Sequence, residues 1–206
     1  MSQITLLSAG KREQTKVANR QAILDAARST FADLGYEVAT VRDIIGRTGL
    51  ASGTFYNYYR SKEEVFDALA DDGARRFRPI LRAQCERAEG FESFLRGAMS
   101  AYFRFLAQEQ ETWRLQRPAG EAVPHPRQTP EMTAVFDEVR TAFSRTLERE
   151  HMPEVDLDYL TASAIAVARE LGEKMLERRP VDVDAATDFA VALIMGGVSA
   201  LPRTPL

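Results

Sequence analysis

The sequence predicts an all-α protein with about nine helices, arranged as a small N-terminal domain of three helices and a larger helical domain. Apolar residues recur three and four positions apart through most of the chain, which is the spacing of one helical face. No segment alternates apolar and polar residues as a half-buried strand would. With 206 residues, of which 45% are hydrophobic, the chain can bury a sizeable core.

The first helix is expected over residues 17–34. Its apolar face consists of Ile23, Ala27, Phe31 and Leu34. Gly35 should end it, because glycine adopts a left-handed backbone at little cost.

Two short helices joined by a tight turn are expected next, within residues 40–62. Thr40 can cap the first of them, and Asp43 completes a capping-box pattern in its first turn. Gly49 should end this helix, and Ser52 is expected to cap the second one. Ser61 and Glu64 form a further capping box for the helix that follows. The spacing indicates a helix-turn-helix.

The outward face of the second short helix carries hydroxyls, an amide and tyrosines, because Phe55 and Tyr59 should face the core. Hydroxyls and helix N-terminal N–H groups bind phosphates, Asn57 can pair with adenine, and Ala51 can meet a thymine methyl. We therefore predict a DNA-binding segment; the alternative is a helical hairpin with a solvated polar face. The predicted DNA-binding residues are Thr40, Arg42, Ala51, Ser52, Gly53, Thr54, Tyr56, Asn57, Tyr58 and Lys62.

Residues 20–69 resemble the DNA-binding domain of the TetR family of one-component transcriptional regulators. The densest matching runs are Ile23-Leu24-x-Ala26-Ala27, Thr40-Val41-x-Asp43-Ile44 and Gly49-Leu50-x-Ser52-Gly53-Thr54-Phe55-Tyr56-x-Tyr58-Tyr59-x-Ser61-Lys62. The resemblance implies a homodimer on a double-stranded DNA operator and repression relieved by a small lipophilic molecule, although some relatives activate. The sequence departs from a simple basic reading helix, because no basic residue lies between Thr48 and Arg60.

Charge is distributed unevenly along the chain. Residues 1–62 hold nine Lys and Arg against five Asp and Glu, whereas the rest holds 18 against 25. The positive field therefore belongs to the predicted DNA-binding part. Residues 1–16 are expected to form a flexible basic arm with Lys11, Arg12 and Lys16, and Arg20 follows at the start of the first helix. The arm either touches phosphates or the minor groove, or is a solvated tail.

The predicted effector-binding and dimerisation domain covers residues 63–200, followed by a tail over 201–206. Its helices are expected at 62–87, 91–108, 111–116, 130–149, 156–178 and from Asp182 or Asp184 to 199. Pro79 should kink or split the first of these helices. Residues 117–130 contain four prolines and are expected to form a long irregular connection, which either gates a pocket or is simply exposed together with His125.

Aromatic residues concentrate in this domain, which favours a largely apolar pocket for a small lipophilic or aromatic effector. The candidate effector-binding residues are Phe77, Phe94, Tyr102, Phe103, Arg104, Trp113, Phe136, Arg140 and Phe143. The alternative for each aromatic residue is an ordinary place in the core, and for each arginine a place on the surface.

The last two helices are expected to form the homodimer interface, because small residues among large ones allow close helix approach. The candidate interface residues are Leu160, Ala164, Val167, Ala168, Leu171, Met175, Phe189, Leu193 and Gly196. The alternative is that these faces are buried only within the monomer. A dimer is also expected because two DNA-binding domains, placed about one DNA turn apart, can bind the two halves of a near-palindromic operator.

Other classes of protein fit the sequence poorly. No nucleotide-binding, zinc-protease or serine-hydrolase motif appears, so we do not expect an enzyme. The two dispersed histidines and the single cysteine, Cys85, lead us to expect no metal or other cofactor. No membrane span or export signal is apparent, and a cytoplasmic location is expected. An effector-independent DNA-binding protein remains a second hypothesis.

Overall fold

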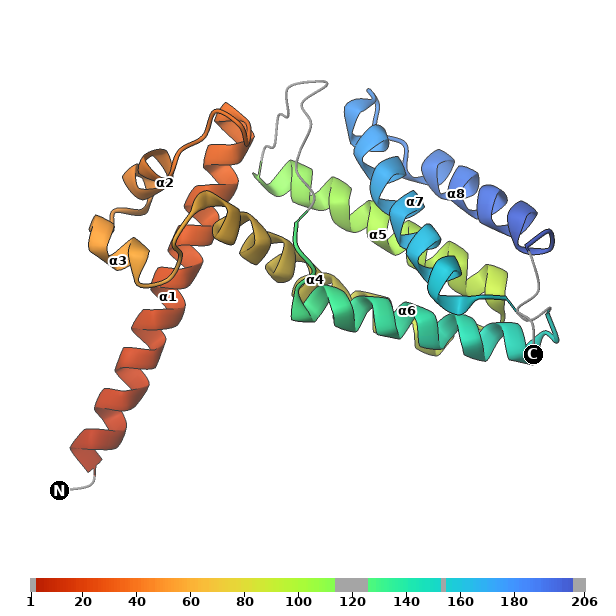
Figure 1. Ribbon diagram of the computed structural model, residues 1–206, viewed down its shortest axis with the longest axis horizontal. Helices are drawn as coiled ribbons and strands as arrows, with labels where there is room; N and C mark the ends of the chain where they lie inside the picture. The colour runs from red at the N-terminus through yellow and green to blue at the C-terminus, as the bar shows by residue number, and fades with distance from the viewer. Residues whose placement is uncertain (1–2, 114–125, 153–154, 202–206) are drawn as a thin grey trace. The chain divides into compact units, whose positions relative to one another are not determined.

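The computed structural model describes residues 3–113, 126–152 and 155–201, without the side chains of residues 3–9 and 111–113. Every regular element in these ranges is an α-helix, which confirms the predicted fold class (Figure 1). The helices are α1 (Gln3–Leu34), α2 (Val41–Thr48), α3 (Ser52–Tyr56), α4 (Lys62–Arg87), α5 (Phe91–Trp113), α6 (Pro130–Arg149), α7 (Leu157–Glu177) and α8 (Val183–Val198). None of these helices has the length and apolar composition needed to span a bilayer.

The described ranges contain eight helices rather than the expected nine or so. A separate short helix over 111–116 is wrong for its described part, because α5 continues to Trp113. The remaining residues of that expected helix, and most of the proline-rich connection including His125, lie outside the described residues.

The chain forms two compact units, with a boundary inside α4 between Ala70 and Asp71. Unit 1 contains α1, α2, α3 and the first turns of α4, and it also includes Trp113 at the end of α5 and residues 126–127. Unit 2 contains the rest of α4, α5 up to residue 112, and α6–α8. The helix α4 is continuous through Pro79, so the split considered from the sequence does not occur.

The core of unit 1 takes one apolar face from each of its helices. Its fully buried side chains are Ile23, Leu24 and Ala27 of α1, Ile44 of α2, Phe55 of α3 and Val65 of α4. Leu34 was expected on the same face of α1, but it is 39% exposed at the end of that helix. Gly35 ends α1 with a φ of 78°, as its position predicted.

The start of α1 differs from the sequence-based expectation. We expected an arm over residues 1–16, whereas α1 begins at Gln3. The residues from Lys11 to Lys16 are good helix formers apart from Thr15, and none is a proline, so nothing local ends the helix before residue 17.

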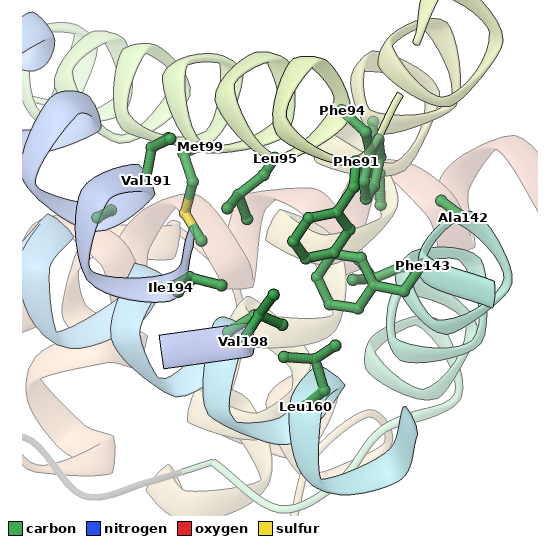
Figure 2. Close-up of a cluster of buried hydrophobic side chains, with 14 of the residues drawn as sticks. Phe91, Phe94, Leu95, Met99, Ala142, Phe143, Leu160, Val191, Ile194 and Val198 are labelled. Atoms are coloured by element: carbon green, nitrogen blue, oxygen red, sulfur yellow. The ribbon is translucent and has the colours of Figure 1, made fainter. Parts of the chain in front are cut away.

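Unit 2 is held together by a core that draws side chains from every helix in it. Phe91, Phe94, Leu95 and Met99 of α5 converge with Phe143 of α6, Leu160 of α7 and Val191, Ile194 and Val198 of α8 (Figure 2). The helix α7 packs against both α6 and α8. The phenylalanine rings stack edge to face or tilted, with the Phe91 and Phe143 centroids 5.2 Å apart.

The helix starts in unit 2 follow the sequence. Thr129 caps α6 and is followed by Pro130 in the first turn, as expected. Asp156 caps α7, with its carboxylate accepting from the N–H groups of the first turn. Asp182, rather than the alternative Asp184, caps α8. The caps at Thr129 and Asp182 depend on residues three or fewer positions away, which is why they could be predicted.

Candidate DNA-binding interface

The turn between α2 and α3 is fixed by local hydrogen bonds. The Thr40 hydroxyl accepts from the Asp43 N–H at 3.3 Å, and the Thr40 N–H donates to the Asp43 carboxylate at 2.9 Å, which confirms the capping box. The Thr40 hydroxyl also donates to the Asp43 carboxylate at 2.6 Å, and this bond, followed by the one from the Thr40 N–H, lowers the pKa of Asp43. Gly49 ends α2 with a φ of 69°, and the Leu50 N–H then donates to the Thr48 hydroxyl at 3.0 Å. The direction in which the chain enters α3 is thereby set.

The helix α3 has five residues, and its buried face is Phe55, which is 0% exposed. Tyr59 follows in the same core at 8% exposed. Ser52 was expected at the N-cap, but Ala51 occupies that position and no side chain caps the helix. The reason is that Ala51 is the residue with an extended backbone, so Ser52 is already the first residue of the helix.

The opposite face of α3 is open. Tyr56 is 56% exposed, and Ser52, Gly53 and Asn57 are also exposed. A side chain added at Gly53 would meet nothing within 4 Å, so the backbone there is accessible to a large partner. Of the other predicted contact residues, Thr40, Arg42 and Ala51 are exposed, whereas Thr54 and Tyr58 are half-buried.

Lys62 is the predicted DNA contact that the structure places elsewhere. Its ammonium donates to the carbonyl oxygens of Tyr36 at 2.9 Å, Glu37 at 3.1 Å and Ala39 at 3.2 Å. It also lies 4.6 Å from the centre of the Tyr36 ring. An ammonium has three donors, and all three are used within unit 1. We therefore leave Lys62 out of the proposed DNA-binding set and assign it to holding the chain after α1.

The predicted effector-binding residues fall into two groups. Phe77, Phe94, Phe103 and Phe143 are at most 8% exposed and belong to the core of unit 2, and Tyr102 and Phe136 are half-buried. Arg104 and Arg140 are exposed, and the Arg140 guanidinium donates to Asp158 at 2.5 Å. These two arginines therefore have the surface placement that was the alternative for them. The side chain of Trp113 lies outside the described residues.

The predicted dimer-interface residues also divide into a buried group and an exposed group. Leu160, Ala164 and Met175 of α7 are at most 6% exposed, and they pack into the core of unit 2. A second chain could not reach them, so their expected place in the interface is corrected. Val167, Ala168 and Leu171 are half-buried against the same core.

The exposed part of α8 is apolar. Phe189 is 60% and Leu193 is 51% exposed, and Ala192 and Gly196 are exposed beside them. We call these four residues the α8 face; their spacing of three and four positions places them on one side of the helix. Tyr159 of α7, which is 77% exposed, was missed by sequence reasoning. Nothing in the sequence distinguishes these apolar residues from buried ones.

The sequence matches a known family over unit 1. The family described as "Bacterial regulatory proteins, tetR family" matches residues 23–69. This range contains α2, α3 and the packed part of α1, together with the first turns of α4.

Individual relatives extend the likeness to most of the chain. The HTH-type transcriptional activator FasR of Mycolicibacterium smegmatis is 25% identical over 191 residues, which cover 90% of this chain and 85% of FasR. The HTH-type transcriptional repressor AcnR of Corynebacterium efficiens is 37% identical over 83 residues, covering 40% of this chain and 42% of AcnR. The transcriptional regulator FadR of Bacillus subtilis, solved in complex with stearoyl-CoA, has a similar fold, with a TM-score of 0.67 and 18% identity over 86% of this chain and 98% of FadR.

Proposed function

Because this chain belongs to the TetR family of DNA-binding transcriptional regulators, we propose that it binds a near-palindromic operator as a homodimer and leaves it when a small lipophilic or aromatic effector binds unit 2. The observation that carries the proposal is the open polar face of α3, held on a rigid turn by the capping box and Gly49. The match to the family supports DNA binding, and the contacting residues, the operator and the effector are our proposal.

The contacts to bases are assigned to the exposed end of α3. Asn57 presents an amide that can donate to and accept from adenine, and Tyr56 presents a ring and a hydroxyl. Gly53 lets the backbone approach the duplex, while the hydroxyls of Ser52 and Thr40 are suited to phosphates. Arg42, Ala51, Thr54 and Tyr58 complete the proposed set.

A selection experiment tests this assignment. Duplexes that the protein enriches from a random-sequence library provide the operator, and the affinity of variants is then measured on it. Asn57→Ala and Tyr56→Ala should each weaken binding by about 1–3 kcal/mol, or roughly 5- to 150-fold, because base contacts have that value. Both side chains are exposed, so the melting temperature should not change. Gln108→Ala, which removes an exposed amide from unit 2, is the control.

Unchanged affinity in both variants, with the fold intact, would show that another surface reads the operator. Failure of the wild-type protein to enrich any duplex would contradict the DNA-binding proposal itself.

We assign the dimer interface to the α8 face and its surroundings on α7. A row of exposed apolar side chains on a helix is costly in water unless a partner covers it. A two-fold symmetric interface buries the same apolar side chains on both copies. It also places two DNA-binding domains on one near-palindromic operator. Leu193→Glu should give a folded monomer on analytical ultracentrifugation, whereas Lys174→Glu, on an exposed polar position of α7, should remain a dimer. A Leu193→Glu dimer of wild-type stability would move the interface elsewhere.

The effector class is supported by the composition of unit 2, whose core is rich in aromatic side chains. The fold relative from Bacillus subtilis was solved with stearoyl-CoA, so this acyl thioester is the first probe. A ligand shifts an equilibrium only if it binds one state better, so the effector must bind free protein more tightly than DNA-bound protein. Since α4 contributes residues to both units, a movement of α4 when the effector binds would change the spacing of the two DNA-binding domains in the dimer.

Two measurements test the effector proposal. Native mass spectrometry of protein purified from cells should reveal a bound small molecule, and stearoyl-CoA should lower the affinity for the selected operator. A protein that carries no small molecule and whose DNA affinity no acyl thioester alters would favour the effector-independent DNA-binding protein. A reporter placed behind the operator distinguishes repression, which we propose, from activation.

A further inference from the structure

The helix α1 extends past α2 and α3 (Figure 1), and its residues 11–16 are all polar. Residues 10–18 are all exposed, so this part of the helix packs against no apolar surface of unit 1. A helix without packing gains only its small intrinsic propensity in water. A partner that contacts the helix would therefore stabilise it.

This part of α1 is also strongly basic. Residues 10–20 contain four Lys and Arg and one acid, Glu13. Lys11, Arg12 and Lys16 make no ion pair with any residue that the structure describes. Their charges are therefore available to an anion.

Three of these cations converge with a residue from the reading segment. Lys11, Arg12, Thr15, Lys16 and Tyr58 line an open hollow of about 400 Å³. Tyr58 follows α3 by two positions and belongs to the set proposed to contact DNA. The hollow is wide enough for a phosphate group with its water, and it is lined by long cationic side chains rather than by a fixed set of donors.

The reading helix itself lacks the charge that DNA binding needs. No basic residue lies between Thr48 and Arg60, and the Lys62 ammonium is engaged by three carbonyls. Neutralising phosphates supplies most of the sequence-independent part of DNA affinity, so that charge must come from another segment.

We propose that the hollow between α1 and Tyr58 binds a backbone phosphate of the operator, next to the bases that α3 reads. This inference rests on the proposed DNA-binding function and adds a second contact site to it. Lys11, Arg12 and Lys16 neutralise the phosphates that flank the major groove. Tyr58 forms the wall between this site and the reading face. The site fixes the position of the protein on the duplex and carries no sequence information.

The test compares two triple variants on the selected operator and on a scrambled duplex. Lys11→Ala/Arg12→Ala/Lys16→Ala removes the proposed site, and Arg87→Ala/Lys174→Ala/Arg178→Ala removes the same charge from exposed positions in unit 2. Each lost phosphate contact lowers the dependence of log affinity on log salt by about 0.9, so the first variant should lose about 2 to 3 units of slope and the control none. Hydroxyl-radical footprints should lose protection only at the sugars flanking each half-site.

Four outcomes are informative. An equal loss on both duplexes, with the ratio of their affinities unchanged, supports a phosphate site. A wild-type salt slope and footprint in the first variant would overturn the inference while leaving base reading by α3 intact. A changed base preference at flanking positions would also overturn it, because the residues would then be reading a groove. If the wild-type protein binds no duplex, the DNA-binding proposal fails instead.

Discussion

Lys62→Met provides a direct test of how unit 1 is held together. The substitution keeps a long apolar stem and removes an ammonium that donates to the carbonyls of Tyr36, Glu37 and Ala39. Those carbonyls follow the end of α1, and Lys62 begins α4, so the ammonium ties two helix ends together. The loss should therefore appear as lower stability of unit 1.

The magnitude follows from the three hydrogen bonds. A hydrogen bond to a charged group contributes about 1.5–3 kcal/mol net, but three that share one ammonium are not additive. In the variant, water can donate to the Glu37 carbonyl in place of the Lys62 ammonium, because Glu37 is exposed. The ammonium beside the Tyr36 ring adds about 0.5–1 kcal/mol at such a half-exposed position. We expect the free energy of unfolding to fall by about 2–3 kcal/mol, close to one strong charged bond.

The assay is urea unfolding followed by circular dichroism, with Lys16→Met as the matched control. Lys16 is exposed on α1 and makes no ion pair with a described residue, so its loss should change stability by less than about 0.5 kcal/mol. The salt slope of DNA binding by Lys62→Met should equal that of the wild type. Wild-type stability together with a slope lower by about 0.9 would refute the reasoning and return Lys62 to the DNA contacts.

Three further predictions concern the turn, the ion pairs of α4 and pH. Gly49→Ala should cost about 1–2 kcal/mol in urea unfolding, because the φ of 69° strains any residue with a Cβ although a Cβ there would meet nothing within 4 Å. Arg76→Met removes two bonds to Glu109, at 2.6 and 2.7 Å, and should cost about 1–2 kcal/mol after allowance for its partial exposure, with a double-mutant cycle against Glu109→Gln isolating the pair. The hydrogen bonds from Thr40 lower the pKa of Asp43, so they stabilise the fold above the pKa of an unfolded aspartate, about 3.9, and the stabilisation is lost as the pH falls through the lower folded pKa. Asp43→Asn should remove that part of the acid dependence in urea titrations at stepped pH.

The local features of the helix-turn-helix in unit 1 could be predicted from the sequence alone. The capping box at Thr40, the left-handed Gly49 and the buried Phe55 depend on residues within a few positions of each other. The N-cap of α3 was misplaced by one residue, because serine and the preceding alanine both fit the end of the turn and the hydrogen-bonded turn decides between them.

The candidate sites beyond unit 1 could be predicted only in part. The sequence indicates that α7 and α8 are apolar, but both buried and exposed apolar residues occur on them. Leu160 and Leu193 are chemically alike. One faces the core of unit 2 and the other faces solvent, because α6 and α5 cover only one side of the pair.

The sequence by itself determined the all-α class, the ends of α2, α4 and α6 and the DNA-binding motif, since each depends on contacts between near neighbours in the chain. Only the tertiary structure decided that the Lys62 ammonium is used by carbonyls more than twenty positions away, and that Lys11, Arg12 and Lys16 meet Tyr58 around one hollow. Those arrangements depend on which helices pack together, and packing is set by the whole apolar core rather than by any one segment.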